Sequence, residues 1–249
     1  MLVTIGALLL SYILPLTLYF FLRAAHGDDA AYKKDCRGLL LNGLLLGFPV
    51  FGFSLLCGLL FRLTRLGDAH PLLELLFKNF VMLALSEELM KYLSARRIIN
   101  KNRARLSFLD LMAYTMISAI GFELMESAVY LFTSSVPQVL VRGVTNMHAV
   151  FGMIMGFLLA SLYRKGSRLP LLPALLIPTL IHGLYDLGVS ERFVNTPLGG
   201  VSLLLAVLCL GLNIAAFFFF RKKRRDPRFT APLFPQTEGD GRDPAAEEA

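Results

Sequence analysis

The sequence predicts an all-α integral membrane protein, a polytopic helical bundle with about seven transmembrane helices. Hydrophobic residues make up 55% of the 249 positions and charged residues only 17%. A helix needs roughly 20 apolar residues to cross a hydrocarbon core about 30 Å thick. Runs of about this length recur along the chain, and each is expected to be one span: residues 2–22, 38–61, 76–97, 108–133, 143–163, 169–189 and 198–220.

The distribution of basic residues predicts the orientation of these spans. Loops between seven spans alternate between the two sides of the membrane, and eighteen lysines and arginines fall on one side. The opposite side has four, namely Arg62, Arg65, Arg142 and Arg192. Because positively charged loops remain in the cytoplasm, the N-terminus is expected outside and the C-terminus inside. The net charge of +7 therefore reflects topology, and no nucleic-acid partner is expected.

The chain is expected to form one membrane domain followed by a tail. The first run is too long for a signal peptide and lacks a preceding basic stretch, so it is expected to remain as a span. Residues 1–225 then form a single polytopic domain in the lipid bilayer, with the polar motifs at 76–189. From Asp226 onward the sequence is acidic and rich in proline. Residues 226–249 are therefore expected to be a disordered cytoplasmic tail.

Ionisable residues in four consecutive spans are the main functional signal. Each charge costs roughly 2.5–3.5 kcal/mol at the centre of a membrane helix, so such residues usually pair or serve a function. The third span contains "SEELMK", in which Glu87 and Lys91 share a helix face with Glu88 beside them. The fourth, fifth and sixth spans contribute Glu123 and Glu126, then His148, then His182 and Asp186.

Some of these residues also have a plain structural explanation. A single intramembrane glutamate can simply bond a neighbouring helix, and for Glu123 this explanation and a functional role stay open. Asp110 is expected at the membrane interface, and His26 and His70 are expected in loops. The remaining groups converge from four spans and are predicted to form one functional site: Glu87, Glu88, Lys91, Glu126, His148, His182 and Asp186.

Carboxylates and imidazoles around an admitted water are the groups that hydrolysis requires. A positioned carboxylate can act as general base, while imidazoles can donate to a developing oxyanion or bind a metal. The H-E-x-x-H motif of many zinc proteases is absent from the sequence.

A proton- or cation-coupled transporter would also bury such ionisable residues in its membrane helices. The sequence shows neither the inverted repeat nor the paired broken helices typical of many transporters.

Four motifs in order resemble those of the PrsW family of bacterial intramembrane proteases, which are distant relatives of the CAAX prenyl endopeptidases. The motifs are "EELMK", "GFELME", "HAVFG" and "HGLYD". They extend from residue 87 to residue 186, and each lies on its own predicted span. Glu123 stands outside the motif positions, and the first two spans and the tail lie outside the resemblance.

The resemblance implies peptide-bond hydrolysis within or beside the plasma membrane of a bacterial cell. Either Glu87 or Glu88 would activate water, and the choice between them stays open. Glu126 and His148 would hold that water, while Lys91 would fix the glutamate pair. The implied partner is a membrane-protein substrate with a single span, such as an anti-sigma factor.

His182 and Asp186 would stabilise the oxyanion or complete a site for zinc or another divalent metal. The family is described as metalloproteases, whereas the CAAX enzymes look glutamate-dependent, and both schemes stay open. The superfamily also resembles a scaffold subunit of gamma-secretase, but a non-catalytic scaffold has no need of both glutamates and both histidines. Counting 1.5 Å per residue from the outer helix ends places most of the site in the outer half of the membrane. Cleavage is therefore expected near the extracytoplasmic side.

Overall fold

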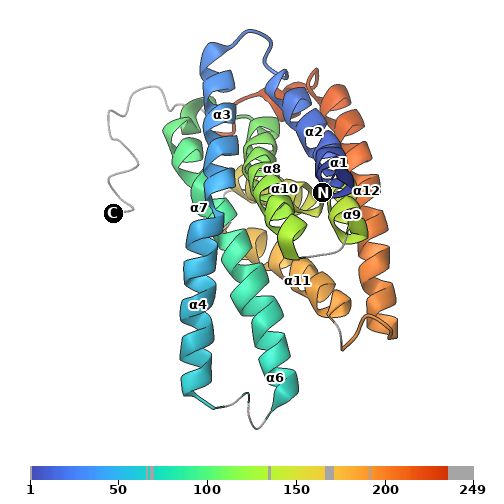
Figure 1. Ribbon diagram of the computed structural model, residues 1–249. Helices are drawn as coiled ribbons and strands as arrows, with labels where there is room; N and C mark the ends of the chain where they lie inside the picture. Colours follow the sequence, from blue (N-terminus) through green and yellow to red (C-terminus); the bar gives the residue numbers. More distant parts are fainter. Residues whose placement is uncertain are drawn as a thin grey trace.

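The computed structural model describes residues 2–65, 67, 70–133, 136–165, 171–190 and 192–234, which are mostly helical (Figure 1). No β-strand occurs among these residues, and one isolated β-bridge joins Ser107 to Pro232. In chain order the helices are α1 (Leu2–Ser11), α2 (Ile13–Arg23), α3 (Ala30–Leu45), α4 (Gly47–Leu63), α6 (Pro71–Leu76), the π-helix η1 (Phe77–Leu85), α7 (Ser86–Lys101), the 3₁₀ turn η2 (Arg103–Arg105), α8 (Phe108–Thr133), α9 (Val136–Thr145), α10 (Met147–Arg164), α11 (Leu171–Val189), α12 (Pro197–Lys223) and α13 (Pro227–Thr230).

The predicted all-α membrane bundle is confirmed, and the described residues of each predicted apolar run are mostly helical. Within the described part of the chain, five helical stretches are long and apolar enough to cross a membrane: Ala30–Leu63, Phe108–Tyr130, Val139–Arg164, Leu171–Val189 and Pro197–Lys223. The first run yields only a shorter apolar helix, Leu9–Arg23. The third run forms η1 and the first part of α7, where charged side chains interrupt the apolar sequence. The number of spans and their orientation therefore stay predictions.

Helix α8 lies at the centre of the bundle, beside α10 in Figure 1. In the span Phe108–Tyr130, 94% of the most apolar stretch is buried inside the protein. Glycines allow α10 to approach it closely, because a Cβ added at Gly152 would lie only 2.7 Å from the backbone oxygen of Thr115. On another face of α8, Gly121 meets Gly43 of α3 with the same lack of space for a side chain. Close backbone packing through small residues is typical of membrane helix interfaces.

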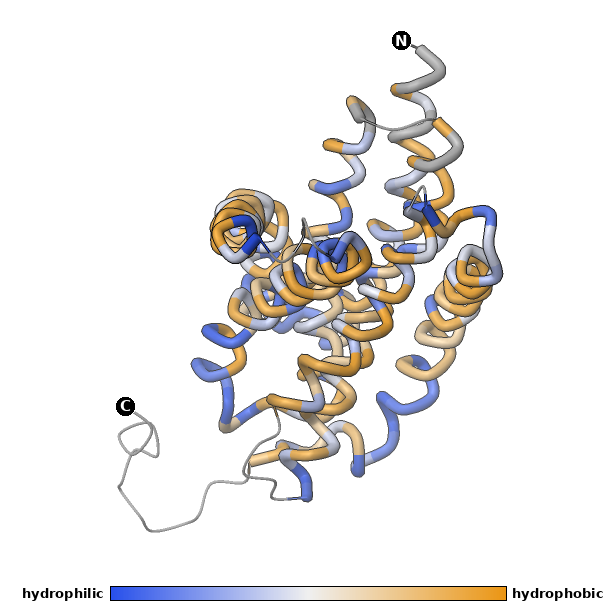
Figure 2. The backbone as a smooth tube through the Cα atoms, turned by 90° about the horizontal axis from the view of Figure 1, so that it is seen from below, coloured by the Kyte–Doolittle hydropathy of each residue, from blue (hydrophilic) through white to orange (hydrophobic). Residues whose placement is uncertain are grey.

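Large apolar side chains cover the outside of the bundle. On α4, Phe48 and Phe51 are exposed, and on α12 so are Leu203 and Val207. Figure 2 shows hydrophobic residues along the outer helices and hydrophilic residues gathered near several helix ends and connections. In water so much exposed apolar surface would be unfavourable, whereas in a bilayer it contacts the acyl chains. The fold therefore presents its apolar surface outward to lipid.

The segment 226–234 differs from the disorder expected from Asp226 onward. The ring of Phe229 in α13 packs edge-on against Phe108, with the ring centroids 5.2 Å apart. The backbone N–H of Leu233 donates to the carbonyl of Leu106 at 2.8 Å. Phe229 and Leu233 pack against the buried core and Phe234 contacts the ring of Tyr163, so this segment lies against the bundle. Residues 235–249 lie outside the described residues.

Candidate active site

The polar residues predicted from four spans lie together inside the bundle. Glu87, Glu88 and Lys91 come from α7, while His148 comes from α10 and His182 from α11. None of these five residues is more than 5% exposed. The two outer members of the cluster are Glu126 of α8 and Asp186 of α11, whose side chains are 16% and 18% exposed. The cluster is therefore buried, with two carboxylates at its mouth.

A π-helix directly before α7 helps to position its glutamates. Segment η1 contains nine residues, and π-helical turns are rare and frequent at functional sites. Ser86 Oγ donates to the carbonyls of Met82 at 2.6 Å and Leu83 at 2.8 Å. Ser54 of α4 also donates to the Met82 carbonyl, at 2.5 Å. These hydroxyls satisfy backbone oxygens at the junction from which Glu87 projects into the bundle.

Lys91 binds several members of the cluster. Its Nζ lies 2.9 Å from Glu88 Oε1 and 3.6 Å from Glu87 Oε2. The same atom lies 2.7 Å from His148 Nδ1 and 4.5 Å from the centre of the Phe122 ring. The sequence paired Lys91 with Glu87 by helical spacing, whereas Glu88 is the nearer carboxylate. Lys91 thus connects the glutamate pair of α7 to the histidine of α10.

Both ring nitrogens of His182 face carboxylates. The Nδ1 atom lies 3.0 Å from Glu88 Oε1, while Nε2 lies 3.7 Å from Glu87 Oε2 and 3.3 Å from Asp186 Oδ2. The ring stacks on Phe151 at a centroid distance of 5.0 Å. When the Nδ1–H of the neutral ring donates a hydrogen bond to Glu88, the lone pair of Nε2 is directed toward Glu87. Glu88 and Phe151 thus orient this imidazole.

A break between α9 and α10 places His148 in the first turn of α10. At this break Asn146 adopts a left-handed conformation, with φ of 43°. Asn213 of α12 stabilises the turn, since its Nδ2 donates to the carbonyl of Thr145 at 2.7 Å. His148 Nε2 then lies 2.6 Å from Glu126 Oε2 and 4.0 Å from Glu87 Oε2. The break gives His148 access to carboxylates on both α7 and α8.

Arg142 is a site residue that the sequence analysis missed. Its guanidinium forms a close ion pair with Glu126, and its Nη2 lies 3.2 Å from His148 Nε2. Its Cζ also lies 4.1 Å from the centre of the Tyr130 ring. By sequence it was counted only among the basic residues of an outer loop. Its place in α9, one turn before Asn146, could have indicated a side chain that points toward the site.

Three polar residues outside the family motifs gain an explanation from the structure. Glu123 belongs to the cluster, because its Oε2 lies 3.9 Å from His148 Nε2 and its Oε1 accepts a hydrogen bond from Ser127 at 3.1 Å. Asn213, a lone polar residue in an apolar run, supports the break before His148. Asp110 is buried and only 5% exposed, and its expected position at the membrane interface stays a prediction. It lies at the other end of α8 from the cluster, with His26 2.5 Å away.

The cluster has the donors for a divalent metal ion. Ligand atoms of Glu87, His148 and His182 all lie within 4.8 Å of one another. Zinc bonds of about 2.0–2.1 Å in a tetrahedral site require donors about 3.4 Å apart, so the 3.7 Å and 4.0 Å separations from Glu87 Oε2 need only a small contraction. Glu87 Oε2 is buried without a hydrogen-bond partner, as an atom reserved for a ligand would be.

The excess of carboxylates in the cluster and the outer contact of His182 also suit a cation. Its carboxylates outnumber its two basic side chains, Lys91 and Arg142, which favours a bound cation or retained protons. Glu88 at His182 Nδ1 provides the carboxylate that commonly supports a metal-binding histidine. The Lys91 ammonium donates to His148 Nδ1, which directs the neutral ring's proton to Nε2 and toward Glu126. Binding of a metal at His148 would require that proton to leave.

Comparison with known families agrees with this geometry. The family model described as PrsW family intramembrane metalloprotease matches residues 37–217, which include all four motifs. The chain belongs to the PrsW family. The resemblance of the motifs to this family is thereby confirmed, and the match extends well beyond them on both sides.

Several relatives with the name Protease PrsW resemble this member of the PrsW family. The relative from Clostridioides difficile is 30% identical over 159 residues, which cover 59% of each chain. The match therefore spans less than two thirds of that relative. The relative from Halalkalibacterium halodurans is 29% identical over 184 residues, covering 70% of this chain and 77% of the other. The relative from Oceanobacillus iheyensis is 26% identical over 147 residues, covering 57% and 68%. No solved structure matches the chain significantly.

Proposed function

We propose that this protein is an intramembrane endopeptidase that hydrolyses a peptide bond of a membrane-protein substrate. One observation carries this proposal beyond family membership. Glu87 Oε2 is buried without a hydrogen-bond partner and lies between two imidazoles, 4.0 Å from His148 Nε2 and 3.7 Å from His182 Nε2. A free carboxylate oxygen facing two nitrogens is suited to hold a water molecule or a metal ion and to accept a proton.

The surrounding residues have distinct roles in this proposal. Glu87, His148 and His182 would hold a divalent ion such as zinc, which when bound activates water and polarises a carbonyl. Glu88 and Lys91, joined at 2.9 Å, fix the orientation of both imidazoles. Glu126 and Asp186 are the partly exposed carboxylates. They can exchange protons with an entering substrate and with water.

The substrate is expected to reach the site from the extracytoplasmic side of a bacterial plasma membrane. Glu126, His148 and Asp186 lie near the end of α8, the start of α10 and the end of α11. These helix ends meet at one end of the bundle. The basic residues Arg164 and Lys223 mark the opposite end, where the positive-inside rule places the cytoplasm. A single-span protein such as an anti-sigma factor would be cut near the outer end of its span.

A cleavage assay with the purified full-length protein tests the proposed activity. Single-span model substrates should be cut, and the Glu87→Gln variant should lose about 10²–10⁴-fold in rate, as expected for removal of a positioned carboxylate. Glu74→Gln on α6, a similar change away from the cluster, should cut like the wild type. A chelator should abolish cleavage, and added zinc should restore it, if a metal is used. A fully active Glu87→Gln variant would exclude this mechanism.

Fusion reporters and fragment analysis test the proposed orientation. A reporter fused after Arg225 should be active in the cytoplasm, and one inserted after Arg65 should be active outside. Mass spectrometry of the released substrate fragment should show a new terminus in the outer half of the substrate span. A cut on the cytoplasmic side would contradict the proposed orientation of the site.

A further inference from the structure

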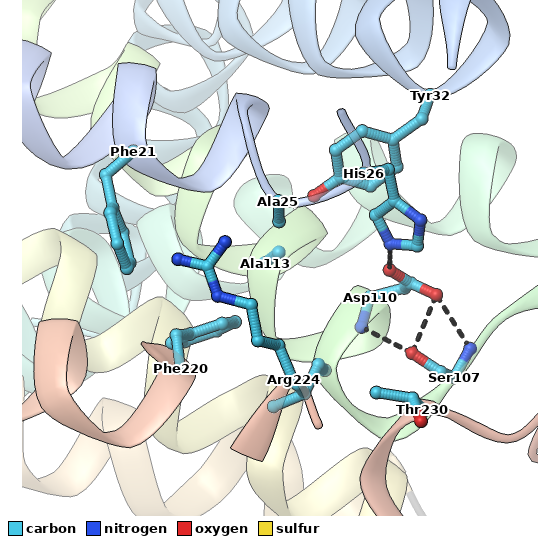
Figure 3. Close-up of a pocket in the computed structure, with 11 residues that line it drawn as sticks. Phe21, Ala25, His26, Tyr32, Ser107, Asp110, Ala113, Phe220, Arg224 and Thr230 are labelled. Atoms are coloured by element: carbon cyan, nitrogen blue, oxygen red, sulfur yellow. Dashed lines mark hydrogen bonds and ion pairs between the residues drawn. The ribbon is translucent and has the colours of Figure 1, made fainter. Parts of the chain in front are cut away.

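A largely apolar cavity with a few polar groups in its wall lies at the other end of α8 from the active-site cluster. It has a volume of about 240 Å³, and Figure 3 shows the side chains around it. The walls come from the end of α2 and the start of α3, from the first turns of α8 and from the end of α12. Phe21, Tyr32 and Phe220 form the aromatic part of the wall, and His26, Asp110 and Arg224 contribute charged groups.

Arg224 is the distinctive residue of this cavity. Figure 3 shows its guanidinium extending into the space between Phe21 and Ala113, and its Cζ lies 5.8 Å from the centre of the Phe21 ring. Among the described residues it has no ion-pair partner. Its neighbour Lys223, by contrast, pairs with Asp226 at 3.6 Å. Arg224 is an exposed residue that also lines the cavity, and its positive charge has no carboxylate partner among the described residues.

The carboxylate in the cavity does not cancel this charge. Asp110 Oδ1 lies 2.5 Å from His26 Nε2, and Asp110 Oδ2 accepts hydrogen bonds from the N–H and the Oγ of Ser107 at 2.9 Å and 2.7 Å. The hydrogen bond to Asp110 raises the pKa of His26 above its ordinary value, although burial acts in the opposite direction. The Asp110 oxygens are thus occupied by His26 and Ser107, and neither oxygen forms an ion pair with Arg224.

The location of the cavity identifies the class of anion that meets it. The surrounding segments carry the basic residues Arg221, Lys222 and Arg225 and the end of the basic loop at Arg105. In the proposed orientation these residues lie at the level of lipid headgroups on the cytoplasmic side, where basic pockets between helices bind anionic headgroups. The volume is below the roughly 300 Å³ typical of sites for larger ligands. A single phosphate with a short attached group would fill it.

We propose that this cavity binds a phosphate group, with Arg224 as its principal ligand. A guanidinium presents paired donors that match two phosphate oxygens. The phosphate can belong to the headgroup of an anionic phospholipid or to a free anion in the cytoplasm. Binding at this site stabilises the end of the bundle where α2, α8 and α12 meet, far from the proposed catalytic groups.

Thermal unfolding of the full-length protein in nanodiscs tests this proposal without reference to proteolysis. Circular dichroism suits the measurement, because the sequence contains no Trp. Nanodiscs with phosphatidylglycerol should raise the unfolding midpoint by about 2–4 °C relative to phosphatidylcholine alone. Arg224→Gln should abolish this difference, and Arg224→Lys should retain part of it. Arg225→Gln, the same charge change at a neighbouring residue outside the cavity, should keep the difference intact.

Two additional arms distinguish the sources of the phosphate. Inorganic phosphate added to phosphatidylcholine nanodiscs should raise the midpoint of the wild type only if the site accepts the free anion. A response to phosphatidylglycerol alone assigns the site to a lipid headgroup. Equal loss in Arg224→Gln and Arg225→Gln would show general surface attraction and overturn the proposal. Absence of any shift with both phosphate sources would also overturn it.

Discussion

The enclosed helix α8 and the outward-facing helix α4 are both rich in apolar residues, yet they carry different side chains. In the span that contains α8, 94% of the most apolar stretch is buried, against 11% in the span that contains α4. Helix α8 carries Glu123 and Glu126 together with the small residues Ser118 and Gly121. Helix α4 instead exposes large apolar side chains such as Phe48, which is 79% exposed.

The difference shows how burial works when the solvent is a bilayer. Apolar side chains gain little by leaving lipid for the protein interior, so large ones remain on the outside. Polar and charged groups are costly in lipid, so they collect where other helices can satisfy them. Small residues then allow the close helix packing that such an interior requires. Apolar composition therefore marks a span, whereas its polar and small residues mark its enclosed face.

Among substitutions that compare the enclosed interior with the outer helix α4, removal of Arg142 should have the largest effect on stability. Arg142→Ala leaves the largely buried Glu126 carboxylate without its ion-pair partner, and breaking such a pair costs about 3–5 kcal/mol. We expect both a lower unfolding midpoint and a loss of cleavage. Arg62→Ala, at the exposed end of α4, should change stability by no more than about 0.5 kcal/mol. Chemical denaturation in detergent measures both variants, and equal effects would contradict a special role for Arg142.

Substitution of a glycine packed against α8, compared with one on the outer helix α4, should have an intermediate effect on stability. Gly152→Ala places a Cβ 2.7 Å from the Thr115 backbone oxygen and 2.9 Å from the Cβ of Ala119. Overpacking of this kind costs about 1–3 kcal/mol. Gly52→Ala on α4 meets no atom within 4 Å and should be neutral or gain up to about 1 kcal/mol from helix propensity. If unfolding midpoints fell equally in both variants, the α8–α10 interface would not be the tightly packed one.

The smallest effect is expected from His26 at the far end of α8. Asp110, and more weakly Asp29, raise the pKa of His26, while Arg105 and burial lower it, with a net increase. Because the folded-state pKa is the higher one, the added stability is fully present below the unfolded value near 6.5. It is lost as the pH rises through the folded-state pKa. The His26 side chain is 42% exposed, so the pair contributes less than about 1 kcal/mol.

Unfolding midpoints measured from pH 5.5 to pH 9 check this expectation. The wild type should lose stability relative to His26→Gln as the pH rises, because the substitution removes the titrating group but keeps a hydrogen-bonding side chain. Arg224 stands across the same cavity, so the comparison is repeated in Arg224→Gln. Parallel profiles of the wild type and His26→Gln would show that the His26–Asp110 pair does not contribute to folding.

Much of the helical framework and the composition of the cluster could be predicted from sequence. Apolar length identifies membrane helices because the bilayer sets a minimum span. Intramembrane ionisable residues stand out because their insertion is costly, and this singled out Glu87, His148 and His182 before any contact was known. The pairing of Lys91 was only partly anticipated, since helical spacing allows both Glu87 and Glu88 as partners.

The sequence by itself determined that the chain folds as membrane helices and which ionisable residues must be enclosed. Only the tertiary structure decided how these groups meet, because their distances depend on packing between helices that are remote in sequence. Arg142 lies in the site because the chain breaks between α9 and α10 at Asn146. Asn213, more than sixty residues later in the sequence, stabilises that break by a hydrogen bond. Phe229 likewise contacts Phe108, which lies more than one hundred residues earlier in the sequence. Local composition predicts which groups need partners, and the three-dimensional packing selects those partners.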